Sequence, residues 1–245
     1  MTIQPDLNGH VALVTGGSRG IGAAIAMALA EAGAAVAVNF LERAAKADAV
    51  VASIKSKGGR AIAVAANVSQ AAAIAEMVDH AAFALGPIDI LVNNAGIAIV
   101  RGIDELTKAE FDATIAVNLK SAFLCTQAVL PGMRAKQWGR IVNISSGAAR
   151  GAGAIGVHYN ASKAGMEGLT RGYAARLVKE GITVNAVAPS LIETDMMRGR
   201  SELAARIPLG RMGQPDEVAQ AVLMVLGNDY MTGQTIMLNG GMAFI

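Results

Sequence analysis

The sequence predicts an α/β fold, in which one doubly wound, parallel sheet of seven strands carries helices on both faces. Short apolar runs alternate with longer helical runs from one end of the chain to the other. Glycines mark many of the junctions, and no linker or low-complexity segment divides the 245 residues. This alternation favours right-handed crossovers between parallel strands. Residues 1–245 are therefore expected to form a single domain.

The expected strands are the short apolar runs. Residues 11–15 are apolar and are followed at once by glycines, which is typical of a strand buried on both faces. The other strands are expected, in chain order, at 35–39, 61–66, 88–92, 140–144, 182–187 and 235–238.

The expected helices lie between these strands, and several end at glycine or Gly-Pro. The long helical run is expected to be interrupted near Pro131, because proline removes a helical hydrogen bond. The helices are predicted at 23–31, 43–57, 71–84, 107–136, 159–180 and 216–226.

Composition favours a compact cytoplasmic protein. The chain is 53% hydrophobic and only 16% charged, with a net charge of +2 and no block of Lys or Arg. Neither nucleic acid nor an anionic membrane is therefore an expected partner. The single Cys125 excludes an internal disulfide, and residues 1–10 lack the pattern of a secretory signal. No uninterrupted apolar stretch approaches the length of a membrane span, and no His cluster suggests a metal site.

A glycine-rich turn directly follows the first expected strand. Gly16, Gly20 and Gly22 fit the spacing Gly-x-x-x-Gly-x-Gly and lead into an Ala-rich helical run. A strand, a glycine turn and a helix can bring a pyrophosphate against free backbone N–H groups. Alone, the pattern is also typical of a tight turn that binds nothing. A second signal, Asn93-Asn94-Ala95-Gly96 after the fourth strand, favours a nucleotide site, because parallel strands end at the same edge of a sheet.

Tyr159 and Lys163 stand four residues apart on an expected helix, so they face the same side. A tyrosine ordinarily titrates near pH 10, and an adjacent ammonium favours the phenolate. Lowering the phenol pKa by about two units needs roughly 2.7 kcal/mol. Ser146 precedes Tyr159 by thirteen residues, at the end of the fifth strand. These side chains are suited to carbonyl chemistry, in which a hydroxyl polarises the carbonyl and a phenol transfers a proton.

From about His10 to the C-terminus, the chain resembles the short-chain dehydrogenase/reductases, a family with the Rossmann fold. The matching segments appear in the family's order and at its spacing. The ending Asn-Gly-Gly-Met at 239–242 is most similar to the 3-oxoacyl carrier-protein reductase branch. The resemblance rests on residues 15–22 and 93–96, on Asn118, Ser146, Tyr159 and Lys163, and on Pro189 with Thr194.

The resemblance implies four catalytic residues: Asn118, Ser146, Tyr159 and Lys163. Tyr159 would donate the proton and Ser146 would orient the carbonyl. Lys163 would lower the pKa of Tyr159 and bind the nicotinamide ribose. Asn118 would hold a water that reaches Lys163; its alternative role is that of a buried amide bonded to the backbone. Ser145 competes with Ser146, but the family's offset to Tyr159 favours Ser146 and leaves Ser145 to cap or pack.

NADPH is the expected cofactor. NAD enzymes commonly place an acid at the end of the second strand, whereas this chain has Asn39 and Phe40 there. Arg19 can meet a 2′-phosphate through charge-assisted hydrogen bonds. Ser190 departs from the glycine that usually follows Pro189 in the family. The expected cofactor contacts are Gly16, Ser18, Arg19, Gly20, Ile21, Gly22, Asn39, Phe40, Asn67, Val68, Asn94, Ala95, Gly96, Tyr159, Lys163, Pro189, Ile192 and Thr194. In the family Thr194 and Asp195 begin a substrate lid, which here continues with Met196 and Met197.

The expected reaction is reduction of a 3-oxoacyl thioester, and the resemblance implies a homotetramer. Two alternatives stay open: a reductase of small ketones, and a nucleotide-binding regulatory protein without activity. In the carrier-protein branch, basic residues beside the active-site entrance meet the acidic carrier. Gln137 and Glu180 occupy those positions here, and the neighbouring Lys136 and Lys179 point about 100° away on a helix. Strong selectivity for a carrier-bound substrate is therefore not expected.

Overall fold

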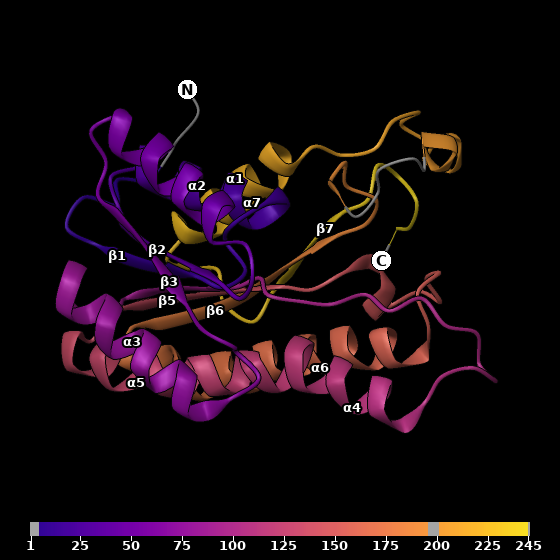
Figure 1. The fold of residues 1–245 in the computed structure, drawn as a ribbon, viewed down its shortest axis with the longest axis horizontal. Coiled ribbons are helices and arrows are strands. Elements are labelled where there is room, and N and C mark those ends of the chain that lie inside the picture. The colour runs from indigo at the N-terminus through magenta and orange to yellow at the C-terminus, as the bar shows by residue number, and fades with distance from the viewer. Residues whose placement is uncertain (1–4, 196–200, 245) are drawn as a thin grey trace.

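The computed structural model describes residues 5–195 and 201–244, so Met196 and Met197 of the expected lid lie outside the described part. The described strands form one parallel sheet, as the sequence predicts (Figure 1). Their order across the sheet is β3-β2-β1-β4-β5-β6-β7. The strands are β1 (Val11–Val14), β2 (Ala35–Phe40), β3 (Ala61–Ala65), β4 (Ile90–Asn93), β5 (Gly139–Ile144), β6 (Ile182–Pro189) and β7 (Thr235–Leu238).

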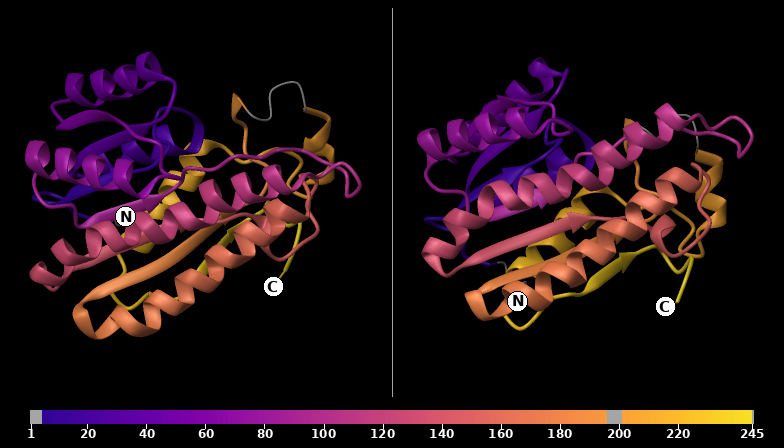
Figure 2. Two further views of the ribbon diagram at one scale, coloured as in Figure 1. Left: turned by 60° about the horizontal axis from the view of Figure 1, so that its bottom comes forward. Right: turned by 90° about the horizontal axis from the view of Figure 1, so that it is seen from below.

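Helices cover both faces of the sheet (Figures 1 and 2). One layer consists of α1 (Gly20–Glu31), α2 (Ala44–Ser56) and α7 (Pro215–Leu226). The other layer consists of α3 (Ala71–Leu85), α4 (Lys108–Ile115), α5 (Ser121–Lys136) and α6 (Val157–Leu177). The fold is therefore the doubly wound α/β sandwich that the sequence predicts.

The two layers enclose separate halves of the core. Along β1, Ala12 and Val14 pack in the cluster that contains α1 and α7, whereas Leu13 packs in the cluster that contains α3 and α5. Successive strand residues point to opposite faces. Since both faces are buried, the central strands are continuous apolar runs, which is why they could be located from sequence.

The expected interruption of the long helix near Pro131 is wrong. Pro131 lies inside α5, on its exposed side, where water can satisfy the carbonyl that proline leaves without a helical donor. The helix instead widens into a π-helical turn at Ala116–Lys120, between α4 and α5. Such turns are frequent at functional sites, and this one contains Asn118.

Lys108–Lys136 is also the one helical stretch among the described residues that is long and apolar enough to cross a membrane by length and composition. It comprises 29 residues. Its segments pack against α3 and α6, so its apolar side contributes to one helical layer of the fold.

Candidate active site

Four motif-bearing strands are neighbours in the sheet. β1, β4, β5 and β6 lie side by side and run in parallel, so their carboxyl ends meet at one edge. The glycine turn follows β1, Asn93 ends β4, and Ser146 and Pro189 lie at the ends of β5 and β6. The predicted cofactor and catalytic motifs therefore share one edge, where doubly wound sheets bind ligands.

The glycine turn is shaped for close approach of a ligand to the backbone. Gly16 and Gly20 have positive φ angles of 63° and 52°, which side chains rarely adopt. A Cβ on Gly22 would collide with the carbonyl oxygen of Gly16 and would lie 2.5 Å from Asn94 Nδ2. The turn leads into the first residues of α1, where backbone N–H groups lack helical acceptors. This geometry fits the pyrophosphate of a dinucleotide.

Asn39 holds this turn from the side of β2. Its Oδ1 accepts from Gly16 N at 3.1 Å, and its carbonyl accepts from Gly17 N at 2.8 Å. Its Nδ2 donates to three backbone carbonyls, of Phe40, Val64 and Ala66. Asn39 is 2% exposed. The sequence predicts a cofactor contact at Asn39, but the structure turns its side chain inward to support the glycine turn.

Asn94 and Thr15 hold the turn from the side of β4. Asn94 Nδ2 donates to the carbonyls of Thr15 and Gly16 at 2.9 and 3.1 Å. The hydroxyl of Thr15 accepts from the backbone N–H groups of Asn94 and Ala95, both at 3.0 Å. Thr15 was not among the expected site residues. Its signal in the sequence is a lone hydroxyl at the end of an apolar run.

The other expected contacts along the cofactor edge vary in exposure. Arg19 is exposed and extended at the start of α1, whereas Ser18, Ile21 and Phe40 are half-buried. Asn67 Oδ1 accepts from the N–H and hydroxyl of Ser69, which shapes the turn after β3 beside the buried Val68. Arg19 is thus the expected contact that presents a charge to solvent at this edge.

The segment after β6 closes the edge from the other side. Pro189 ends β6, and Ile192 is 6% exposed and forms a bridge with Gly213. A Cβ on Gly20 would lie 3.3 Å from Thr194 Cγ2, so the segment after β6 reaches across to the glycine turn. The glycine turn and the segment after β6, which are the two expected sides of the cofactor site, are therefore in contact at Gly20 and Thr194.

The two neighbouring serines have different surroundings. Ser145 is 3% exposed, and its hydroxyl donates to the carbonyl of Lys163 at 3.2 Å, so it packs between β5 and α6. Ser146 is half-buried, caps the 3₁₀ turn Gly147–Ala149 and accepts from Ala148 N at 3.2 Å. It also hydrogen-bonds the side chain of Tyr159. Only Ser146 therefore stands beside the phenol.

The electrostatics at Tyr159 differ from the sequence-based expectation. Burial raises the pKa of Tyr159, and the hydrogen bond with Ser146 opposes this rise. Lys163 is 4% exposed, and burial lowers its pKa to about 8. Its Nζ donates to the carbonyl of Ile144 at 2.7 Å and lies 5.8 Å from the centroid of the Tyr159 ring. The expected lowering of the Tyr159 pKa by Lys163 is therefore not found, because the ammonium is desolvated and directed at a backbone carbonyl.

Asn118 joins the π-helical turn to the segment that follows β4. Its Oδ1 accepts from Ile97 N at 2.8 Å, and its Nδ2 donates to the Ile97 carbonyl and to Ser162 Oγ at 3.0 and 3.2 Å. A Cβ on Gly96 would lie 3.4 Å from Asn118 Oδ1 and 3.8 Å from Lys163 Nζ. The side chain thus hydrogen-bonds the backbone, and Lys163 Nζ lies near it at the same glycine, Gly96.

His158, next to Tyr159, is fully buried. Its Nε2 lies 2.9 Å from the carbonyl of Ile99, which ties the start of α6 to the segment after β4. In the described residues no group of three or more His, Cys, Asp or Glu side chains is arranged to hold a metal. The burial of His158 and its contact with the Ile99 carbonyl give it a packing role beside the site.

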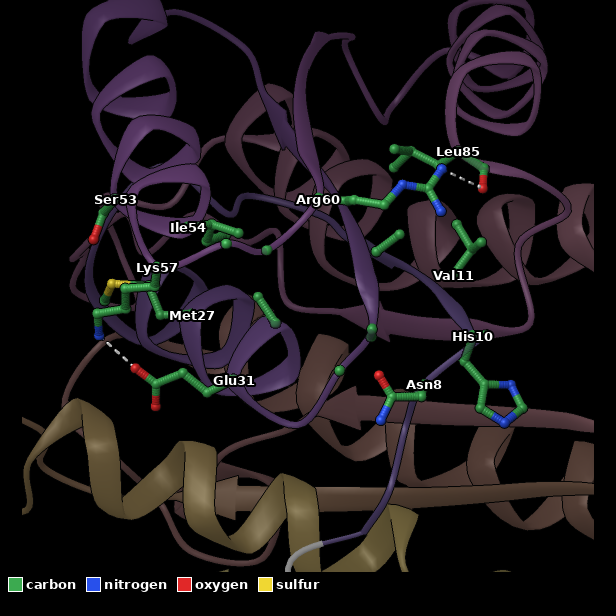
Figure 3. A pocket seen from close by; sticks show the side chains of 17 residues that line it. Asn8, His10, Val11, Met27, Glu31, Ser53, Ile54, Lys57, Arg60 and Leu85 are labelled. Carbon is green, nitrogen blue, oxygen red and sulfur yellow. Dashed lines mark hydrogen bonds and ion pairs between the residues drawn. The ribbon is translucent and has the colours of Figure 1, made fainter.

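A cavity of about 450 Å³ opens at the opposite edge of the sheet, among the starts of β1, β2 and β3 (Figure 3). Lys57 pairs with Glu31 at its rim, and Arg60 donates to the carbonyl of Leu85 at 3.3 Å (Figure 3). None of the expected catalytic residues lines it. This cavity is separate from the edge that carries the cofactor motifs.

Gln137 and Glu180 also lie at that opposite edge. Gln137 precedes β5 and Glu180 precedes β6, whereas Ser146 follows β5. The expectation that both positions flank the active-site entrance is therefore wrong within one chain. The starts and ends of parallel strands lie at opposite edges of a sheet.

Comparisons with known proteins agree with this geometry. Residues 10–204 match the family model for short chain dehydrogenases. The chain is 43% identical to a 3-oxoacyl-[acyl-carrier-protein] reductase of Synechocystis, covering 96% of this chain and 98% of the relative. It is 42% identical to a (2S)-[(R)-hydroxy(phenyl)methyl]succinyl-CoA dehydrogenase subunit of Thauera aromatica, covering 96% and 97%.

Solved structures give the same result. A dehydrogenase/reductase from Sinorhizobium meliloti superposes with a TM-score of 0.93 at 39% identity, covering 99% of this chain and 98% of that one. A blue fluorescent protein from a metagenomic library, in complex with NADPH, gives 0.92 at 40% identity, covering 98% and 100%. The chain therefore belongs to the short-chain dehydrogenase family and is an oxidoreductase close to the 3-oxoacyl carrier-protein reductases.

Proposed function

We propose that residues 1–245 form a single catalytic domain that reduces 3-oxoacyl thioesters with NADPH. The observation that carries the proposal is the position of Ser146, Tyr159 and Lys163 beside one another at the strand edge that also bears the glycine turn. Both curated relatives described above are named for acyl thioester substrates, one on a carrier protein and one on coenzyme A. Family resemblance adds a cytoplasmic homotetramer to the proposal.

The chain's own residues would act on the carbonyl oxygen. When bound, NADPH supplies a hydride. Ser146 donates a hydrogen bond to the carbonyl oxygen and Tyr159 donates its proton as negative charge develops there. Burial raises the pKa of Tyr159, which keeps the phenol protonated at neutral pH, as a proton donor must be. Lys163, whose pKa burial lowers to about 8, is largely charged at pH 7, and the family resemblance assigns it to the nicotinamide ribose.

Asn118 and Lys163 would return the proton. Gly96 separates Asn118 Oδ1 from Lys163 Nζ, so the two side chains lie on either side of one backbone segment. Resemblance to the family supports a relay from Asn118 through water to Lys163 and then to Tyr159. The bonds from Asn118 to Ile97 also keep this backbone segment in place.

The preference for NADPH rests on the residues around the end of β2. Positions 39 and 40 carry Asn and Phe, so neither offers a carboxylate to a ribose 2′-hydroxyl. The side chain of Asn39 is already hydrogen-bonded to backbone groups. The exposed Arg19 offers a guanidinium, the group best suited to bidentate contact with phosphate. A structural neighbour at 40% identity binds NADPH, which supports the same choice.

Lack of strong selectivity for a carrier protein is also part of the proposal, and the basic residues near the starts of β5 and β6 lie at the edge of the sheet opposite Ser146. Arg134 donates to Glu180 through Nε and Nη2, at 2.6 and 3.2 Å. Lys136 donates to the fully buried carboxylate of Asp89 at 2.6 Å. Both cations are thus paired within the chain and lie at the edge opposite the cofactor motifs, so neither offers an unpaired positive charge for a carrier beside Ser146.

Matched substrates test the proposal. We expect the purified chain to oxidise NADPH with 3-oxoacyl-coenzyme A and with the corresponding carrier-protein thioester. The kcat/KM values for the two substrates should be similar to each other, both at low and at moderate salt. A large, salt-sensitive preference for the carrier-protein substrate would refute the lack of selectivity. NADPH binding without turnover of any thioester or ketone would identify a nucleotide-binding protein instead.

A further inference from the structure

Ser190, the first residue after β6, lies against the turn that carries Ser146. A Cβ added to Gly147 would meet Ser190 Oγ well inside the 3.0 Å that real Cβ atoms keep, and would lie 3.5 Å from Ser190 Cβ. The backbone N–H of Ser190 donates to the carbonyl of Leu238 at 2.9 Å, which fixes this residue at the end of β7. The Ser190 hydroxyl therefore occupies the space that glycine leaves open at position 147.

The contact acts on the residue that matters for carbonyl binding. Ser146 is the cap of the turn Gly147–Ala149, and its Oγ accepts from Ala148 N. The turn packs between α6 and the end of β6. Gly147 is covalently joined to Ser146, so a shift of Gly147 carries Ser146 with it.

The contact between Ser190 and Gly147 is a packing contact and not a hydrogen bond. Within residues 5–195 and 201–244, the Ser190 hydroxyl has no hydrogen-bond partner. Its placement is therefore set by packing against Gly147. Because the Ser190 hydroxyl takes up the space that a side chain at position 147 would need, Gly147 and Ser190 form a matched pair in this chain.

We propose that Ser190 is a positioning residue for carbonyl reduction: it fills the space left by Gly147 and thereby holds the Ser146 hydroxyl beside Tyr159. This inference rests on the proposed function, since it assigns the pair a part in the same reaction. The residue acts through Ser146 and is not itself required to touch the substrate.

A double-mutant cycle tests the pair with Gly147→Ala, Ser190→Gly and the double variant. Ser190→Gly leaves the turn unsupported, and we expect kcat for ketone reduction to fall on the order of 10-fold, since a misplacement of about 1 Å can cost up to about 100-fold. Gly147→Ala forces the Ser190 hydroxyl out of its place and should lower kcat as well. In the double variant, the methyl group that Gly147→Ala introduces fills the space from the other side, so kcat should return toward the wild-type value.

Titration of the Tyr159 phenol gives a readout that does not need turnover. The hydrogen bond with Ser146 lowers the pKa of Tyr159, so its weakening in Ser190→Gly should move the alkaline difference spectrum of Tyr159 to higher pH. The chain has three tyrosines, and a Tyr159→Phe variant identifies the relevant signal. Lys163, with Nζ 5.8 Å from the ring centroid, is the same in every variant. The double variant should restore the wild-type titration.

Three results would overturn the inference. The first is a kcat and a Tyr159 titration that are both unchanged in Ser190→Gly, and the second is a loss of kcat in the double variant that equals the product of the two single losses. The third is a change in NADPH affinity as the main effect of the substitutions. If Gly147→Ala fails to fold, Ser190→Gly and Ser190→Ala still test the pair, and Ser190→Ala should fall between wild type and Ser190→Gly. A wild-type chain that reduces no carbonyl would refute the proposed function, while the Tyr159 titration would still decide whether Ser190 positions Ser146.

Discussion

Replacing Lys163 with methionine should change how the stability of the chain depends on pH. Lys163 is 4% exposed, and burial lowers its pKa from 10.5 to about 8. Below pH 8 the side chain is protonated in both the folded and the unfolded chain, and folding carries the full cost of burying the charge. Between pH 8 and 10.5 the folded chain releases its proton first, so this cost shrinks as the pH rises.

The magnitude follows from the difference between the two pKa values. A shift from 10.5 to about 8 corresponds to roughly 3 kcal/mol at 1.36 kcal/mol per unit. Most of this lies between pH 7 and pH 10. Relative to Lys163→Met, the wild-type chain should therefore gain roughly 2–3 kcal/mol of unfolding free energy over that range.

Urea unfolding without cofactor, followed by circular dichroism at pH 7 and pH 10, measures this gain. Methionine is similar in length to lysine. At a single pH, the difference in unfolding free energy between wild type and Lys163→Met includes changes in packing and the lost hydrogen bond to Ile144. The change of that difference with pH reports only the titration of Lys163. Lys55→Met, on the exposed face of α2, is the control and should show little change. A difference between wild type and Lys163→Met that stays constant with pH would refute the reasoning.

Three further predictions concern the cofactor edge and the core. Arg19→Ala should raise the Kd for NADPH about 10- to 100-fold, from a loss of about 1.5–3 kcal/mol, and change NADH little; equal losses would show that Arg19 does not contact the 2′-phosphate, and Arg176→Ala is the control. Burial raises the pKa of Cys125 to about 12, so iodoacetamide at pH 8 should label the folded chain far more slowly than the chain in urea, and equal rates would contradict this. Asn39→Ala should destabilise the chain by roughly 1–3 kcal/mol in urea unfolding and weaken NADPH and NADH alike, because Gly16 loses its acceptor. If only the affinity for NADPH fell, Asn39 would instead contact the 2′-phosphate.

The fold was predictable because its strands are buried on both faces. Strand runs such as that of β1 contain no polar residue, and alternation with helices then fixes a parallel sheet. The convergence of Gly16, Ser146 and Pro189 followed from one rule, that parallel strands end at one edge. The same rule places Gln137 and Glu180 at the opposite edge, since both precede their strands.

Other features depend on tertiary surroundings that a sequence pattern does not contain. Pro131 is tolerated because it faces outward from α5, and the helix widens around the buried Asn118 instead. The inward direction of Asn39 depends on carbonyls of β3 and the residue after it, which come close only in the folded sheet. The i, i+4 spacing predicts that Lys163 shares a helix face with Tyr159. Burial, which lowers the pKa of Lys163, and the Ile144 carbonyl, which accepts from its Nζ, are visible only in the folded structure.

The most direct test of the account is the turnover of Tyr159→Phe compared with Tyr173→Phe, a second tyrosine on α6 whose hydroxyl bonds Gln127. Single-turnover oxidation of NADPH by a 3-oxoacyl-coenzyme A substrate measures the step that needs the proton. We expect Tyr159→Phe to lose at least about two orders of magnitude in this rate, with nearly unchanged affinity for NADPH, while Tyr173→Phe remains close to wild type. A near-normal rate in Tyr159→Phe would contradict the assignment of Tyr159 as the proton donor.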